Sequence, residues 1–563
     1  MTKSGVIKAV SSFKSGKDVQ RARGVAHNRC ADSERSGGGD DASHIPLNQK
    51  VQREKRAETD DQPDFMGQEY AEQALNAVAP LSDADLDKFD DYRPFFTWFV
   101  IVSQILILAI SLLAYGFGPW GFTMHTYSKK VIVPSLSLQE VEYAEPSNVW
   151  GGPPAAALVR LGAKFAPCMR RDRLVFHNIE KERREERKTA CCIRNDESGC
   201  VQTTQERCSP LLSTFRKWDH SNPGPLVRVP VGQDQFTSVP RTSGTVCGQD
   251  PRFCDSPASV PPNEWSDDVT KWPVCTRPNR ARLSEPHMSC ELIGRPCCIG
   301  MYGQCHITTQ EYCEHVKGHF HEEATLCSQV SCMKDVCGLL PFLEEDRPDQ
   351  FYRAFLSIFL HAGIGHLVCS LIFYFVFMRD MERMIGPFRL AVIYVGSGVG
   401  GNLASAAFVP YRAEVGPAGS ILGVMASCIT VIYYNWEALD DPSRNLTIKL
   451  VITALFFLMG LLFPWIDNYA HFAGFLVGLW LSFILIPYAG IKSFEPLLIR
   501  RKKYMILVGT LFLLVMAVLL CVLVWATPIY DCKFCKYFNC LVSLLNDEIC
   551  PDQDIKITRL DIL

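Results

Sequence analysis

The fold of this chain is predicted by the stretch YRAEVGPAGSILG at residues 411–423 and by a second stretch, AHFAGFLVG, at residues 470–478. Each stretch leads into an apolar run, and each carries two glycines at positions i and i+4, which lie on one face of a helix. Small residues on one face allow two membrane helices to approach closely. We therefore expect these two helices to pack together through Gly419, Gly423, Gly474 and Gly478.

The composition favours a membrane protein with several spans. The chain has 563 residues, 48% of them hydrophobic, and 33 are Phe, which is unusual for a soluble multidomain enzyme. A spanning helix needs about 20 predominantly apolar residues. Seven stretches qualify, at residues 95–115, 355–378, 388–409, 417–434, 447–464, 469–488 and 504–526. We expect an all-α polytopic core with a large domain between its first and second spans.

Basic loops set the expected orientation. Short loops rich in Lys and Arg stay in the cytosol, and two such loops are Arg500–Lys503 and Arg379–Arg383. Counting spans from these loops places the N-terminus in the cytosol and the C-terminus in the lumen. Residues 1–90 are polar throughout, so we expect the first span to act as the targeting signal. The net charge of −3 gives no reason to expect nucleic acid as a partner.

Cysteines are concentrated on the predicted luminal side. Of 24 cysteines, 16 lie between Cys168 and Cys337 and four follow the last span. Disulfides belong to oxidising compartments, and the even counts predict a disulfide framework whose connectivity stays open. The candidates are Cys168, Cys191, Cys192, Cys200, Cys208, Cys247, Cys254, Cys275, Cys290, Cys297, Cys298, Cys305, Cys313, Cys327, Cys332, Cys337, Cys532, Cys535, Cys540 and Cys550.

These patterns divide the chain into parts. Residues 1–93 lack the apolar surface that folding needs, and we expect a mostly disordered cytosolic tail. The other parts are a first spanning helix at 94–117, a cysteine-rich luminal domain at 118–350, spanning helices 2 to 6 at 351–488, a basic cytosolic loop at 489–503, a seventh helix at 504–526 and a luminal tail at 527–563.

A metal site is one alternative within the luminal domain. His315, His319, His321 and Cys327 have a spacing that would suit a metal ion. Disulfide formation in a secretory compartment explains the cysteines more simply. We therefore expect neither a metal nor a cofactor.

The two quoted stretches resemble the rhomboid intramembrane proteases. In that family a Gly-x-Ser-Gly motif supplies the nucleophile, and the histidine of an Ala-His-x-x-Gly-x-x-x-Gly motif is the general base. By this resemblance His471 stands at the base position, and Gly416-Pro417-Ala418-Gly419 places Ala418 at the nucleophile position. The proline and the long cysteine-rich loop after the first span are similar to the inactive rhomboid subfamily, the iRhoms. The resemblance covers residues from about Tyr92 to the C-terminal tail.

The residues at these positions predict a loss of catalysis. The methyl group of Ala418 cannot attack a carbonyl, and deleting one member of a serine-histidine pair costs a hydrolase on the order of a millionfold in rate. Pro417 offers no backbone N–H to an oxyanion. The family's His-x-x-x-Asn pattern, which stabilises the oxyanion, is represented by His366 and Ser370. We therefore expect no catalytic residue, only vestigial ones.

Two residual features bear on chemistry. Ser420 is the nearby alternative nucleophile, but two residues along a helix are a rotation of roughly 200°, so its hydroxyl should face away from His471. His361, His366 and His471 could bond to one another or to water. A polar contact left over from the fold is the simpler interpretation of this cluster.

The resemblance implies a pseudoprotease that binds transmembrane client proteins and regulates their trafficking, maturation or degradation. By resemblance the clients are the tumour-necrosis-factor-α-converting metalloprotease and epidermal-growth-factor-like precursors, with a cytosolic FERM-domain adaptor and the lipid bilayer as further partners. The implied location is the endoplasmic reticulum membrane, with the Golgi and cell membrane.

Two other classes are alternatives. An active intramembrane serine protease would use an atypical nucleophile such as Ser420. A channel or transporter would show inverted repeats or charged residues within the helices, and neither is evident in the sequence.

Overall fold

A computed structural model describes residues 92–541, apart from short gaps at 136, 219–222, 231–234, 262, 280–284, 345, 437–440, 464, 487–495, 531, 533–534 and 540. The expected cytosolic tail, except for its last two residues, lies outside the described residues. Most of the expected basic loop and most of the C-terminal tail, including Cys540 and Cys550, also lie outside them.

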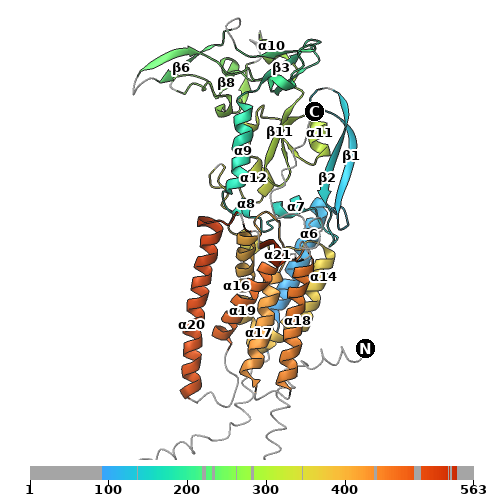
Figure 1. The fold of residues 1–563 in the computed structure, drawn as a ribbon, viewed down its shortest axis with the longest axis vertical. Coiled ribbons are helices and arrows are strands. Elements are labelled where there is room, and N and C mark those ends of the chain that lie inside the picture. Colours follow the sequence, from blue (N-terminus) through green and yellow to red (C-terminus); the bar gives the residue numbers. More distant parts are fainter. Residues whose placement is uncertain are drawn as a thin grey trace, which may run out of the picture.

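The membrane part is a bundle of roughly parallel helices (Figure 1). Within the described residues, six helices are long and apolar enough to cross a membrane, and a shorter apolar helix, α17, lies among them. The helices are α6 (Phe95–Tyr115), α14 (Ile364–Phe373) with the π-helical η6 (Tyr374–Met378) and α15 (Arg379–Ile385), α16 (Pro387–Phe408), α17 (Ala418–Tyr434), α18 (Pro442–Leu462), α19 (Asn468–Leu485), and α20 (Pro496–Cys521) with the π-helical η8 (Val522–Ala526). The chain is therefore a multi-pass membrane protein.

Helices α16, α17 and α19 form the centre of the bundle. Side chains such as Leu390, Tyr394, Leu422 and Met425 are fully buried there. By contrast, α18 and α20 leave most of their apolar side chains exposed, which suits contact with lipid.

Helix α6 is fixed to the bundle by buried polar groups. The Glu382 carboxylate, on α15, accepts hydrogen bonds from the backbone N–H groups of Phe96 and Thr97, at 2.7 Å each. It therefore caps the helix end, where backbone N–H groups lack helical partners. Further along α6, the Gln104 amide donates to the Ile358 carbonyl at 3.2 Å and to the Tyr394 hydroxyl at 3.1 Å.

The second membrane helix begins at Ile364 rather than near residue 355. The apolar residues before it form the short helix α13 (Arg353–Leu356) and a turn. Ile358 and Leu360 are buried against the protein. Hydrophobicity alone does not distinguish residues buried in protein from residues buried in lipid, so the sequence placed the start too early.

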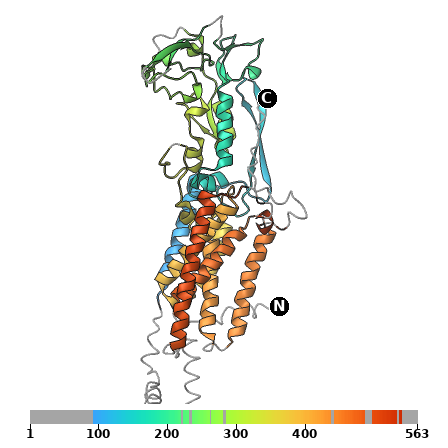
Figure 2. The same ribbon diagram turned by 60° about the vertical axis from the view of Figure 1, so that its left-hand side comes forward.

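The cysteine-rich domain, residues 118–350, stands above one end of the bundle (Figures 1 and 2). It is built from short antiparallel sheets and a prominent helix, α9 (Arg173–Glu186), which Asp172 caps. The sheets pair β1 (Met124–Ile132) with β2 (Leu138–Pro146), β3 (Ala190–Arg194) with β4 (Cys200–Thr203) and β5 (Ser213–Arg216), β6 (Leu226–Pro230) with β7 (Phe236–Pro240), β8 (Cys254–Ser256) with β9 (Arg277–Pro278), and β10 (Arg295–Ile299) with β11 (Gln304–Thr308) and β12 (His319–Phe320). Short helices are α7 (Ala155–Arg160), α8 (Ala166–Met169), α10 (Pro286–Ser289), α11 (Gln310–His315), α12 (Cys332–Cys337) and, after the last span, α21 (Cys535–Asn539).

Disulfides staple this domain, and the expected disulfide framework is confirmed. Two pairs of adjacent cysteines illustrate the connectivity that the sequence left open: neighbouring residues on a strand point to opposite faces, so the two members of each pair have different partners. The bonds in the domain are Cys168–Cys337, Cys191–Cys247, Cys192–Cys208, Cys200–Cys290, Cys254–Cys275, Cys297–Cys313, Cys298–Cys332 and Cys305–Cys327, and a further bond, Cys532–Cys535, follows the last span. The free cysteines in the described part of the chain, Cys369, Cys428 and Cys521, lie on membrane helices.

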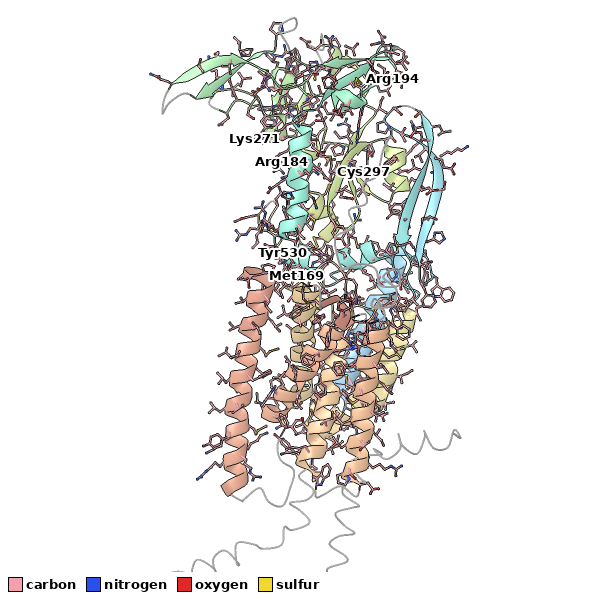
Figure 3. All side chains as sticks on the ribbon, in the orientation of Figure 1. Met169, Arg184, Arg194, Lys271, Cys297 and Tyr530 are labelled. Atoms are coloured by element: carbon pink, nitrogen blue, oxygen red, sulfur yellow. A yellow bond between two sulfur atoms is a disulfide. The ribbon has the colours of Figure 1, made fainter. Side chains whose placement is uncertain are left out.

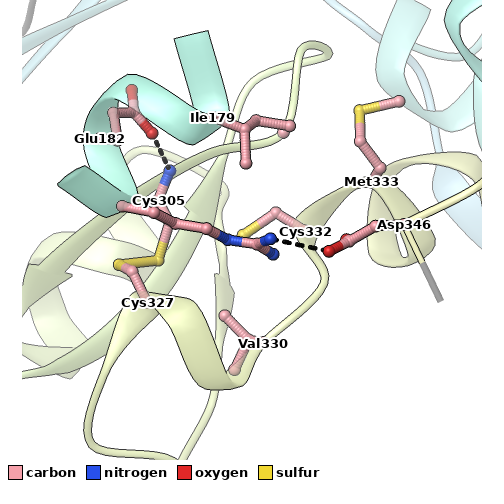
Figure 4. A pocket seen from close by; sticks show the side chains of 10 residues that line it. Ile179, Glu182, Cys305, Cys327, Val330, Cys332, Met333 and Asp346 are labelled. Atoms are coloured by element: carbon pink, nitrogen blue, oxygen red, sulfur yellow. Dashed lines mark hydrogen bonds and ion pairs between the residues drawn. A yellow bond between two sulfur atoms is a disulfide. The ribbon is translucent and has the colours of Figure 1, made fainter. Parts of the chain in front are cut away.

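A small pocket lies where α9 meets the disulfide-bonded loops (Figure 4). Glu182 accepts a hydrogen bond from the Cys305 N–H at 3.5 Å, and Arg183 pairs with Asp346 at 2.7 Å. The cavity measures about 20 Å³, which holds about one water molecule. It is too small for an organic ligand.

The domain also contacts the end of the last membrane helix. The Trp525 indole donates to the Met169 carbonyl at 3.1 Å, and Arg170 donates to the Val524 carbonyl at 2.5 Å. The Tyr530 hydroxyl accepts from the Arg173 N–H at 3.3 Å. Met169 and Tyr530 accordingly lie where the domain meets the bundle (Figure 3).

Candidate functional site

The vestigial site consists of residues 416–418 together with His361, His366, Ser370 and His471. It begins in the loop between α16 and α17, where Gly416 has a φ of +112°. A Cβ at this position would lie 2.4 Å from Cε1 of His366. Both the left-handed backbone and the close ring require glycine. The loop and the His366 ring are therefore in direct contact.

Ala418 is the first residue of α17, and Pro417 stands at its N-cap. Ala418 is partly exposed, and it presents only a methyl group. The proline removes one backbone N–H at the place where an oxyanion would need donors. This end of α17 therefore supplies neither a nucleophilic atom nor a full set of backbone N–H donors.

Backbone contact joins α17 to α19. A Cβ on Gly474 would lie 2.4 Å from the carbonyl oxygen of Gly419, and a Cβ on Gly478 would lie 2.3 Å from Cα of Gly423. Because only glycine permits this approach, the starts of the two helices are brought together. Ala418 and His471 thus lie at the same end of the touching pair.

The His471 ring lies in apolar surroundings. It is 4% exposed and meets the rings of Phe456 and Phe457 edge-on, with centroids 6.1 Å and 6.2 Å away. Within the described residues its Nδ1 atom is buried without a hydrogen-bond partner. The imidazole is retained, but no hydroxyl among the described residues forms a hydrogen bond with it.

Ser420 faces another helix. Its hydroxyl donates to the Tyr394 carbonyl on α16 at 2.6 Å, and a Cβ on Gly398 would lie 2.3 Å from its Oγ. The side chain is fully buried in that contact. The structure therefore does not bring Ser420 to His471.

The remaining histidines form a separate group. The His361 Nε2 atom lies 3.2 Å from the Ser370 hydroxyl, which donates to the His366 carbonyl at 3.1 Å. The His361 and His366 rings are 5.0 Å apart. Across the described part of the chain, no hydrogen bond links His471 to this group, so the three histidines are not one bonded cluster.

Residues 148–152, which we call the cap segment, cover the His366 side of the vestigial site. The Trp150 ring lies over the His366 ring, with centroids 5.2 Å apart. The Gly365 N–H donates to the Trp150 carbonyl at 3.0 Å, and the Asn148 amide donates to the Ala362 carbonyl at 2.7 Å. The cysteine-rich domain thus reaches the His366 side of the vestigial site. The sequence does not indicate this contact, because nothing in a turn-rich Trp-Gly-Gly stretch shows which loop it will cover.

Lys164 connects the cysteine-rich domain to the loop that carries Gly416. It is fully buried, and its ammonium donates to the carbonyls of Val409 at 2.9 Å and Arg412 at 3.2 Å. Its backbone exchanges two hydrogen bonds with Glu414, each 2.9 Å long. Burial lowers the pKa of Lys164 to about 8, against the opposing effect of the Glu414 and Asp467 carboxylates.

Arg353 makes a second buried connection. Its guanidinium donates to the carbonyls of Val159 at 2.6 Å, Ala163 at 3.0 Å and Cys337. It is fully buried, although it precedes a membrane helix. We call Lys164, Arg353 and their partners the seam.

The helical core, the glycine-packed pair and the retained histidine define a class. Residues 348–488 match the Rhomboid domain, and the chain belongs to the rhomboid family.

Within that family its relatives are inactive members. The chain is 46% identical over 471 residues to Inactive rhomboid protein 1 of Danio rerio and 44% identical over 471 residues to that of Homo sapiens, and each alignment covers 84% of this chain and 53% of the relative. It is 45% identical over 436 residues to Inactive rhomboid protein 2 of Homo sapiens, covering 77% of this chain and 50% of the relative. The chain thus groups with the inactive rhomboid proteins, and it spans about half the length of the curated relatives it matches.

Proposed function

We propose that this chain is a catalytically inactive rhomboid that binds transmembrane client proteins and regulates their trafficking, maturation or degradation in the secretory pathway. The observation that carries the proposal is Ala418 at the start of α17, in an otherwise assembled contact with α19. The fold that positions a nucleophile is intact, while the nucleophile itself is absent. Selection for binding would retain the fold without the nucleophile.

The proposed location and orientation follow from chemistry. The disulfides of the cysteine-rich domain suit an oxidising lumen such as that of the endoplasmic reticulum. Arg170 contacts the carbonyl of Val524 near the end of the last span. The basic residues Arg500–Lys503, at the start of that span, therefore lie at the opposite end of the bundle, as basic cytosolic loops do. We infer a cytosolic N-terminus and a luminal C-terminus.

The proposed clients are single-pass membrane proteins, and by family resemblance they include a tumour-necrosis-factor-α-converting metalloprotease and epidermal-growth-factor-like precursors. A cytosolic FERM-domain adaptor is a further proposed partner. A client can contact the bundle and the cysteine-rich domain at the same time, because the seam and the cap segment join these two parts.

Co-purification tests the client proposal. The tagged full-length chain is extracted in detergent from cells that express it, and the bound proteins are quantified by mass spectrometry against a control polytopic membrane protein. We expect enrichment of single-pass membrane proteins. Enrichment no greater than that of the control would contradict the proposal.

Active-site labelling tests the competing function. An active serine protease with an atypical nucleophile would react with a fluorophosphonate probe in a manner that His471→Ala abolishes. The hydrogen bond from Ser420 to Tyr394 supports the opposite result, with no labelling in either protein.

A further inference from the structure

Two histidines and two carboxylates meet on the cysteine-rich domain, away from the vestigial site. His319 and His321 flank Phe320 at β12, and residues two apart on an extended strand point to the same face. The Asp335 carboxylate, on α12, lies 2.8 Å from Nε2 of His321 and 3.9 Å from Nε2 of His319. The two imidazole rings are 4.8 Å apart.

A neutral His321 has too few N–H groups for the two carboxylates that its ring contacts. Its Nδ1 atom lies 2.9 Å from the Glu323 carboxylate, while its Nε2 atom faces Asp335. Ionised carboxylates only accept hydrogen bonds, and a neutral imidazole carries one N–H. One contact therefore needs a further cation, either a second proton or a metal ion.

We propose that His319, His321 and Asp335 bind a zinc ion on the cysteine-rich domain, with water completing the coordination. Imidazole nitrogens with one carboxylate form a donor set that Zn²⁺ prefers. Ligand atoms about 2.0–2.1 Å from a tetrahedral zinc are about 3.3 Å from one another. The two separations between the imidazole Nε2 atoms and the Asp335 oxygens, 2.8 Å and 3.9 Å, bracket that value.

Glu323 has the position of an orienting group. A histidine that binds zinc usually donates its other ring N–H to a carboxylate, which fixes the tautomer and the ring. The Nδ1 contact to Glu323 leaves Nε2 of His321 for the metal. His319 has a half-exposed side chain, so the ion can enter from solvent.

This ligand set differs from the one that the sequence spacing suggested. Cys327 is bonded to Cys305, and His315 contacts the Val141 carbonyl through Nε2 at 2.8 Å. Cys327 is therefore not a thiolate ligand, and Nε2 of His315 is occupied by that carbonyl. Cys298 lies 3.5 Å from His321 but is bonded to Cys332, so it is not a thiolate ligand either.

Zinc stoichiometry tests the proposal. The full-length chain, purified in detergent with a tag that contains no histidine, is stripped with a chelator, dialysed against buffered Zn²⁺ and analysed by mass spectrometry for bound metal. We expect wild type to retain one more zinc than His319→Ala or Asp335→Asn. Glu323→Gln should retain the site with an affinity about 10- to 100-fold weaker.

Controls separate metal binding from misfolding. His125→Ala changes an exposed histidine elsewhere in the same domain and should retain the zinc. Peptide mapping of the Cys298–Cys332 bond verifies the fold of each variant. Cobalt substitution should give visible absorption in wild type that His319→Ala abolishes. Equal zinc content and equal cobalt spectra in wild type and correctly bonded His319→Ala would overturn the proposal and leave a proton as the cation beside His321.

Discussion

The cysteine-rich domain and the helical bundle are stabilised by different kinds of interaction. The domain depends on covalent bonds, such as Cys168–Cys337, which closes a separation of 169 residues and constrains the unfolded chain. The bundle depends on close backbone contact, because α17 and α19 touch at glycines, which have no side chains. Between them, the seam uses buried cations that donate to carbonyls. The comparison teaches that a change of one side chain should cost most at the seam and least in the vestigial site.

We expect the largest effect from Arg353→Leu. The substitution removes the Arg353 donor from the carbonyls of Val159, Ala163 and Cys337, of which Val159 still accepts from the Gly162 N–H at 3.1 Å. A buried polar group that loses its partner costs about 1–3 kcal/mol, so the total should be about 3 kcal/mol or more. The measurement is the thermal stability of the detergent-purified protein, together with proteolysis at the junction of domain and bundle.

Arg171→Leu is the matched control for Arg353→Leu. Arg171 pairs with Glu180 on the surface, where both side chains are about half exposed. Exposed pairs contribute about 0–1 kcal/mol. If the two arginine variants lose equal stability, the seam does not have the importance that its geometry indicates.

We expect the next largest effect from Gly474→Val. Its Cβ would lie 2.4 Å from a backbone oxygen of Gly419, and a backbone cannot rotate away as a side chain can. The cost should reach the upper end of the roughly 1–3 kcal/mol that overpacking costs. Gly509→Ala is the control, because its Cβ would meet only side-chain atoms of Trp480 and Ile484, at 3.1 Å or more. Similar melting temperatures for both variants would contradict close packing of α17 on α19.

The sequence predicted the parts of the molecule that depend on local pattern. Apolar runs predicted the helices, the cysteine distribution predicted the disulfides, and the glycine spacing indicated which helix faces pack. It did not predict the roles of Trp150, Lys164 or Arg353. Each of these side chains acts through carbonyls or a ring far away in the sequence, and only the tertiary fold determines which ones. Hydrophobic pattern likewise placed the start of the second span too early.

The next prediction concerns how the stability of the cysteine-rich domain depends on pH. Burial raises the pKa of Glu182 to about 7 from 4.5, so folding favours its protonated form. This contribution to stability is fully present below about pH 4.5 and is lost as the pH rises through about 7. Glu182→Gln should therefore be more stable than wild type well above pH 7, by roughly 3 kcal/mol, and should match it near pH 4.5.

Thermal melts across this pH range test the Glu182 prediction. Glu180→Gln provides the control on the same helix, since that carboxylate is about half exposed. It should change stability little at any pH. A Glu182→Gln variant whose advantage does not grow with pH would show that the carboxylate is solvated rather than buried.

We expect the smallest effect from Ala418→Ser. The residue is partly exposed at the first position of α17, so a hydroxyl should change stability by no more than about 0.5 kcal/mol. We also expect no fluorophosphonate labelling. The hydroxyl would face a site in which Pro417 removes a donor and the Trp150 ring covers His366.

The double variant Trp150→Ala with Ala418→Ser distinguishes these two obstacles. Labelling that appears only in the double variant and requires His471 would show that the cap segment closes the site. Labelling of Ala418→Ser alone would show that the missing oxygen was the only obstacle, and that the cap contributes nothing to inactivity. Absence of labelling in both would assign the remaining obstacle to the oxyanion side, where Pro417 lacks an N–H and Ser370 replaces an amide, because neither change alters these residues.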